Sequence, residues 1–117
     1  MKYMLVFVET AEDLAKREGA EAPAYWESWS AYVQAVNQAG IVVSGAGLMP
    51  PAMATTVRLR DGKRHVQDGP YSDTKEQLGG FYVIDVPDLD TALDWAAKCP
   101  AAAYASVEVR PVMQMGE

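Results

Sequence analysis

The residue best placed by its neighbours for acid–base chemistry is Asp68, which opens the turn sequence Asp68-Gly69-Pro70-Tyr71. In turns, an Asp carboxylate usually accepts a hydrogen bond from the backbone N–H two residues further on. Here that residue is Pro70, which has no backbone N–H. We therefore expect the carboxylate to bond to the Tyr71 N–H, to another strand or to a ligand. The alternative is that Asp68 only stabilises the turn.

A predicted hairpin places Asp68 beside an apolar surface. Asp61-Gly62 is typical of a two-residue turn and would join the strands Thr55–Arg60 and Arg64–Asp68. In that register Thr55 lies opposite Asp68, and both share a face with three apolar residues, Val57, Leu59 and Val66. Burial at the edge of such a face disfavours the charged form of a carboxylate and increases its basicity. We therefore predict Asp68 as the catalytic residue and Thr55 as its hydrogen-bond partner.

Other polar side chains are candidates for holding a ligand near Asp68. A cationic side chain can fix an anionic group, and a tyrosine hydroxyl can donate a proton or a hydrogen bond. The candidate ligand-binding residues are Thr55, Arg58, Tyr71, Lys75, Glu76, Tyr82 and Arg110. His65, the single histidine, falls on the opposite face of its strand from Asp68, so we expect a solvated side chain and no local dyad. One histidine and one cysteine give little basis for a metal site, and we expect neither a metal nor a cofactor.

Length and charge restrict the class of protein. The 117 residues predict a single domain over 1–117 with a real hydrophobic core. A net charge of −6 argues against nucleic-acid binding and against anionic membrane surfaces. Cys99 is the lone cysteine and precedes Pro100 in an apolar pattern, which predicts a buried thiol. The apolar run at the amino terminus is too short for a signal peptide, so we expect a soluble cytoplasmic protein.

The hydrophobic pattern predicts four strands outside the hairpin and two long helices. The strands are Tyr3–Val8, Ile41–Ser44, Phe81–Val86 and Ala105–Val112, and the helices are Ala22–Gln38 and Leu89–Cys99. Two shorter helical segments are also predicted. Thr10 and Asp13 have the spacing of a capped helix start. Asp73 and Glu76 have the same spacing before a helical turn over Thr74–Leu78, ended by Gly79-Gly80.

The element order predicts an α+β, ferredoxin-like βαββαβ fold with an extra central hairpin. In the first long helix, the spacing of Trp26, Trp29, Val33 and Val36, widened by Tyr25 and Tyr32, predicts a core stripe rather than a cofactor-binding surface. Helices are expected to cover one face of an antiparallel sheet. Because the first strand is apolar on both faces, we expect a second copy to cover the other face and form a homodimer.

The sequence from Asp68 to Val86 closely resembles the YCII-related family, and its DGPF-motif subgroup in particular. Matching motifs occur at Gly45–Pro50, Thr55–Arg58, Asp88–Leu93 and Ser106–Val112, and Tyr71 replaces the usual Phe. The resemblance implies a dimeric α/β barrel with Asp68 as the favoured catalytic or binding residue. Some YCII-like relatives are thought to use a His–Asp pair, from which this chain departs. Most members of the subgroup have no assigned function, and some related domains are joined to sigma factors.

Two functional hypotheses follow. The first is a cofactor-independent enzyme that carries out an elimination or isomerisation on a small organic molecule, in a pocket near the dimer interface, with Asp68 transferring the proton. The second is a non-catalytic ligand-binding or regulatory module associated with sigma-factor transcription machinery. Turnover of a bound small molecule would separate the two hypotheses.

Overall fold

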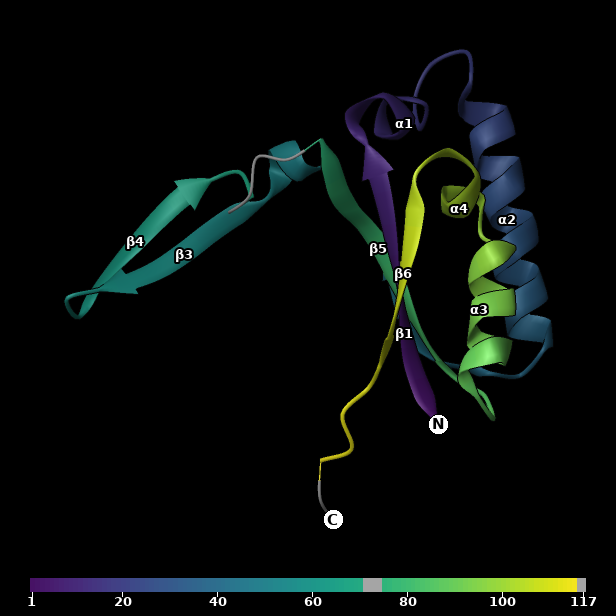
Figure 1. The fold of residues 1–117 in the computed structure, drawn as a ribbon. Helices are drawn as coiled ribbons and strands as arrows, with labels where there is room; N and C mark the ends of the chain where they lie inside the picture. The colour runs from purple at the N-terminus through teal and green to yellow at the C-terminus, as the bar shows by residue number, and fades with distance from the viewer. Residues whose placement is uncertain (71–74, 116–117) are drawn as a thin grey trace.

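The computed structural model is an α+β fold in which helices cover one face of an antiparallel sheet (Figure 1). It describes residues 1–70 and 75–115. The four strands of this sheet lie in the order β2-β5-β1-β6, which is the ferredoxin-like arrangement. Their bounds are β1 (Lys2–Thr10), β2 (Val42–Gly47), β5 (Glu76–Asp85) and β6 (Ser106–Pro111). The predicted fold is confirmed.

The predicted hairpin forms a separate two-stranded ribbon that projects away from the sheet (Figure 1). We call this ribbon, residues 55–68, the arm; it consists of β3 (Thr55–Arg60) and β4 (Lys63–Asp68). Asp61 and Gly62 form its tip with φ angles of 52° and 73°, as a two-residue hairpin turn requires. Thr55 pairs with Asp68, so the predicted register is confirmed.

In the described residues, five helical segments connect the strands, and the two longest lie along the same face of the sheet (Figure 1). The segments are α1 (Ala11–Ala15), α2 (Ala22–Gln38), the 3-10 helix η1 (Pro51–Met53), α3 (Leu89–Ala97) and α4 (Pro100–Tyr104). Thr10 and Asp13 cap α1 reciprocally, as predicted. Pro100 follows the end of α3 and also begins α4. At the first position of a helix, the missing N–H of a proline leaves no hydrogen bond unmade. None of the helices in the described residues is long and apolar enough to cross a membrane.

Strict alternation along β1 divides its side chains between two faces of the sheet. Tyr3, Leu5 and Phe7 point into the helix side and are at most 5% exposed. Met4 and Val6 point to the open side and are only half-buried. The core on the helix side is completed by buried residues in α2, β5, α3 and α4 or directly beside them, namely Tyr32, Val36, Ile84, Val86, Ala92, Ala96, Cys99 and Ala101.

The predicted core stripe of α2 is confirmed at Tyr25, Trp29, Tyr32 and Val36, which are buried or pack against the core, but not at Trp26 and Val33. Trp26 is 47% exposed and Val33 is 36% exposed, whereas Tyr25 and Tyr32 are buried. Each buried tyrosine has a partner for its hydroxyl, since Tyr25 donates to a carboxylate at 2.7 Å and Tyr32 donates to the Trp95 carbonyl at 2.9 Å. A satisfied hydroxyl lets a tyrosine ring enter the core, so both predicted tyrosines are buried while Trp26 stays exposed.

The predicted helical turn over Thr74–Leu78 is wrong in its described part. Strand β5 begins at Glu76 and runs through Gly79 and Gly80 without a break. The glycines serve close approach, because a Cβ at Gly80 would lie 2.8 Å from the Ala46 carbonyl oxygen. Residues 71–74, which include the predicted cap Asp73, lie outside the described residues.

Gly80→Ala should therefore lower the free energy of unfolding by about 1–3 kcal/mol, because the new methyl group meets rigid backbone of β2. The matched control is Gly47→Ala in the same sheet, where a Cβ would meet no atom within 4 Å. Urea unfolding of both variants measures the difference. Equal stability of the two variants would contradict the close approach.

Candidate functional site

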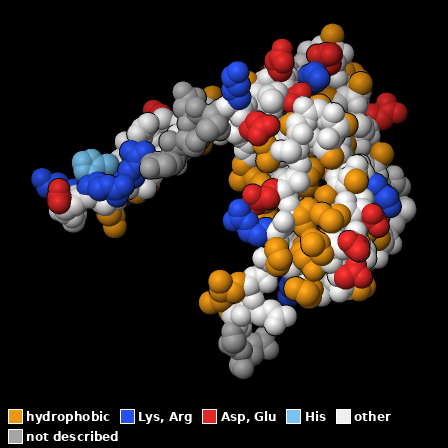
Figure 2. All heavy atoms as spheres, in the orientation of Figure 1, with side chains coloured by type: hydrophobic (Ala, Val, Ile, Leu, Met, Phe, Trp, Pro, Cys, Tyr) orange, Lys and Arg blue, Asp and Glu red, His pale blue; other side chains and the backbone are white. Residues whose placement is uncertain are grey.

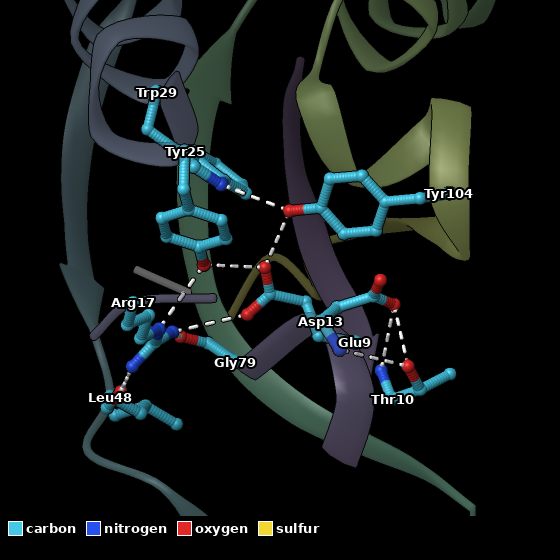
Figure 3. Close-up of polar contacts among 9 residues, drawn as sticks. All are labelled: Glu9, Thr10, Asp13, Arg17, Tyr25, Trp29, Leu48, Gly79 and Tyr104. Carbon is cyan, nitrogen blue, oxygen red and sulfur yellow. Dashed lines mark hydrogen bonds and ion pairs between the residues drawn. The ribbon is translucent and has the colours of Figure 1, made fainter. Parts of the chain in front are cut away.

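The centre of the candidate site is the carboxylate of Glu9, near the end of β1 (Figure 3). Glu9 is 1% exposed, which is unusual for an acidic residue. A buried charge is destabilising unless it is paired and hydrogen-bonded. The surroundings of Glu9 therefore have to supply both a countercharge and hydrogen-bond donors.

Two tyrosines and one arginine supply them (Figure 3). Glu9 Oε1 accepts hydrogen bonds from the hydroxyls of Tyr25, at 2.7 Å, and Tyr104, at 2.6 Å. Glu9 Oε2 accepts from Nη2 of Arg17 at 3.1 Å, which forms an ion pair. The indole N–H of Trp29 donates to the Tyr104 hydroxyl at 3.0 Å. Short bonds to an ionised acceptor are stronger than neutral ones, so the carboxylate is firmly held.

Arg17 is fixed by four partners. Its Nε donates to the Tyr25 hydroxyl at 3.1 Å, and its Nη2 donates to the Gly79 carbonyl at 3.2 Å as well as to Glu9. Its Nη1 donates to the Leu48 carbonyl oxygen. The guanidinium also lies within 6.0 Å of the Tyr25 ring centre and 5.8 Å of that of Trp26. The orientation of this cation is therefore determined by the protein.

Glycine in β5 makes room for this arrangement. Gly79 is buried in the strand next to β1, and a Cβ there would collide with Glu9 Oε2. A glycine inside a strand is otherwise unfavourable, because it contributes no packing and loses more conformational entropy on folding. Its presence at position 79 follows from the buried carboxylate.

Arg17 lies on the wall between two clefts. The larger has a volume of about 730 Å³ and lies between α1, the segment around η1 and the start of β5. The smaller, of about 440 Å³, lies between α2, β2 and β5. Arg17, Trp26 and Met49 line both clefts. The smaller cleft is rich in aromatic side chains, namely Phe7, Tyr25, Trp26, Trp29 and Tyr82.

The network changes the titration of its members. Burial, and then the hydrogen bond to Glu9, raise the pKa of Tyr25 above the usual tyrosine value and that of Tyr104 well above it. Burial alone would lower the pKa of Arg17, but its contacts with Tyr25 and Glu9 more than compensate and raise it. The phenols therefore stay protonated and the guanidinium stays charged at neutral pH.

Asp68 lies outside this network, at the base of the arm, where its side chain is exposed. Thr55 is its partner in the strand register. The turn itself is stabilised by its neighbours, since Thr56 Oγ1 donates to the Gly69 carbonyl at 2.7 Å and the Gly69 N–H donates to the Ala54 carbonyl at 2.6 Å. The dry surroundings expected for Asp68 are therefore not provided by the single chain.

The remaining predicted binding residues are spread over the molecule. Lys75 lines the larger cleft and Tyr82 the smaller one. Arg110 pairs with Glu108 at 2.9 Å on the open side of the sheet, where both side chains are exposed. Two further residues, Arg58 on the arm and Glu76 at the start of β5, lie outside the lining of both clefts, and Tyr71 lies outside the described residues.

Sequence reasoning missed Glu9, Arg17 and Tyr104 as site residues. One signal was available for Glu9, because it continues the alternation of Tyr3, Leu5 and Phe7 and so had to point into the helix side. An acidic residue in that position predicts a buried ion pair. The identity of its partners depends on tertiary contacts, because Tyr104 is 95 residues away in the chain.

Comparison with known proteins decides the family. The YCII-related domain matches residues 1–116. This chain belongs to the YCII-related family. An uncharacterized protein of Rhizobium meliloti (strain 1021), R00369, is 46% identical over 77 residues, which cover 64% of this chain and 62% of the relative's length.

A solved structure has a similar fold. The 5-chloro-2-hydroxyhydroquinone dehydrochlorinase TftG of Burkholderia phenoliruptrix AC1100, in complex with 2,5-dihydroxybenzoquinone, superposes with a TM-score of 0.56. The alignment covers 98% of this chain and 96% of TftG, with 14% sequence identity. At that identity the similarity establishes the architecture of this YCII-related chain.

Glu9→Gln should destabilise the protein by about 3–5 kcal/mol, because the amide leaves Arg17 without a countercharge in a buried site. It also places an N–H₂ donor against the donors of the guanidinium. The control is Glu12→Gln, an exposed residue of α1, which should change stability by about 0.5 kcal/mol or less. Urea unfolding checks both values, and a Glu9→Gln variant as stable as the control would refute the role of the ion pair.

The raised tyrosine pKa values predict loss of stability in alkali. A phenol with a folded-state pKa above its unfolded value of about 10 stabilises the fold below that pH and loses this contribution as the pH rises above it. The free energy of unfolding should therefore fall between pH 10 and 12. Tyr104→Phe should reduce the steepness of that fall in urea titrations, and an unchanged slope would contradict the assignment.

Proposed function

We propose that this YCII-related protein binds a small planar organic anion in the clefts beside Arg17 and acts on it by acid–base chemistry. The observation that carries the proposal is the fixed guanidinium of Arg17 on the wall of both clefts. A guanidinium has five N–H groups, and the bonds described above use four of them. We assign the second hydrogen of Nη1 to the ligand.

The lining of the smaller cleft supports a planar ligand. Aromatic side chains present flat apolar faces and prefer offset or edge-on contacts with other rings. A concave, largely apolar cleft with one oriented polar group is the usual form of a small-molecule site. The 2,5-dihydroxybenzoquinone bound by TftG is a flat ring with acidic hydroxyl groups, so it is a suitable first probe of this chain.

For the proton transfer we propose Asp68, as expected for the DGPF-motif subgroup in which we place this chain. Pro70, two residues further on, lines the larger cleft together with Lys75. In an elimination, the Asp68 carboxylate removes a proton from the ligand, the electron pair moves into the ring, and the leaving group departs as an anion. Lys75 and Arg17 would balance the negative charge of the ligand.

We also propose that the protein is a homodimer that packs through the open side of its sheet. Met4, Val6 and Val83 lie on that side and are half-buried in the single chain. Covering them with the same face of a second copy would remove apolar surface from water on both copies. The proposed dimer interface lies on the opposite face of the sheet from the smaller cleft, which adjoins α2.

Calorimetric titration with 2,5-dihydroxybenzoquinone tests the binding site. Arg17→Gln should weaken binding at least about tenfold, since a charge-assisted hydrogen bond contributes about 1.5–3 kcal/mol. Because this change also leaves Glu9 unpaired, Trp26→Ala is the second variant; it removes an exposed ring that lines both clefts. The control is Arg60→Gln near the tip of the arm. Full affinity in folded Arg17→Gln and Trp26→Ala variants would refute the site.

Turnover separates catalysis from binding alone. With 5-chloro-2-hydroxyhydroquinone as the probe, chloride release should occur with the wild type and be lost in Asp68→Asn. The control Asp61→Asn should keep it, because Asn tolerates the positive φ at the tip of the arm. Binding without turnover would instead favour the ligand-binding or regulatory alternative, and co-purification with a sigma factor would then test that partner.

A further inference from the structure

The arm has two unlike faces. One face carries Val57, Leu59 and Val66, whose side chains are 57%, 68% and 53% exposed. The opposite face is polar and carries three basic residues; it consists of Thr56, Arg58, Arg60, Lys63, His65 and Gln67. The fourth basic residue of the arm, Arg64, pairs with Leu59 on the apolar face. Large aliphatic side chains at such exposure on adjacent strands form an apolar patch, and patches of this kind mark interaction sites.

A ribbon of this kind is not stable by itself. An isolated two-stranded hairpin is only marginally stable in water, because it cannot bury enough apolar surface. The arm forms its own sheet, and within the described residues its apolar face remains open. A partner that covers the apolar face would supply the missing burial.

The shape of the chain leaves space for that partner. The radius of gyration is 16.1 Å. A compact domain of this length is expected at about 13 Å. Figure 2 shows a hollow between the arm and the body, with hydrophobic side chains on the body side of the hollow. The open face of the sheet, with Met4 and Val6, is turned toward the side from which the arm projects (Figure 1).

The distribution of charge indicates what the partner is. The arm, residues 55–68, contains four basic and two acidic residues, whereas the rest of the chain contains six basic and fourteen acidic residues. Two basic arms repel each other, as do two acidic bodies, whereas a basic arm and an acidic body attract each other. The arm of one copy therefore complements the body of another copy of the same chain.

We propose that the arm of each copy reaches over a second copy, so that Val57, Leu59 and Val66 pack against the body of that copy, while Arg64 on the same face and the net positive charge of the arm are attracted to the acidic body. This inference rests on the proposed dimer and adds a second, reciprocal interface to it. Two-fold symmetry places both arms in the same way. Asp68 shares the docking face with Val57 and Val66, so it is brought to the boundary between the two copies.

Sedimentation velocity of single-residue variants tests the arm. Val66→Lys places a charge on the docking face and should raise the dimer dissociation constant at least about tenfold. Gln67→Lys is the matched control, because it adds the same charge one residue further on, on the opposite face of the same strand. Both positions are exposed, so both variants should keep the wild-type far-ultraviolet spectrum.

The outcomes distinguish the arm from the sheet. A wild-type protein that stays monomeric at 100 µM would overturn both the dimer and the arm interface. A dimer that is equally tight in wild type, Val66→Lys and Gln67→Lys would leave the sheet interface standing and overturn the arm interface. Selective loss of association in Val66→Lys supports the proposal.

Trypsin gives an independent readout, because Arg58, Arg60, Lys63 and Arg64 are cleavage sites within the arm. Docking should slow cleavage at these sites at a protein concentration where wild type is dimeric, relative to a dilution where it is monomeric. Val66→Lys should show fast cleavage at both concentrations. Equal cleavage rates of wild type at both concentrations would overturn the docking of the arm.

Discussion

The ion pair between Glu9 and Arg17 is the interaction on which the rest of the site depends. It joins strand β1 to the segment after α1, and through the hydroxyls of Tyr25 and Tyr104 it also ties in α2 and α4. A buried carboxylate without these donors would be strongly destabilising. The same contacts fix the guanidinium at the boundary of two clefts, so one constraint serves both stability and the ligand binding that we propose.

The fold could be predicted from the sequence because its signals are local. Asp61-Gly62 determined the register of the arm, and the alternation of apolar residues determined the strand at Tyr3–Val8. Gly79 and Gly80 led to the wrong prediction of a helical turn before them, because glycine is typical of a helix end as well as of a close approach between strands. Only the neighbouring strand, with Glu9 pointing toward Gly79, distinguishes the two readings.

The candidate site was predictable only in part. Turn motifs can be recognised in a sequence, whereas a buried ion pair between separate segments cannot. The motif at Asp68-Gly69-Pro70-Tyr71 draws attention because its residue types are unusual together, yet its carboxylate is exposed in the single chain. Arg17 lies in a polar stretch with no periodic pattern, and its importance follows only from the groups that surround it. Functional residues at subunit boundaries are hidden in the same way from a sequence read as one chain.

The bond between Glu9 and Tyr104 has a consequence for protein synthesis. A ribosome releases β1 well before the segment Pro100–Tyr104. Until that segment has left the exit tunnel, the carboxylate lacks one of its donors and the helix side cannot close over it. A nascent chain that has not yet released Tyr104 therefore holds the Glu9 carboxylate through Tyr25 and Arg17 alone.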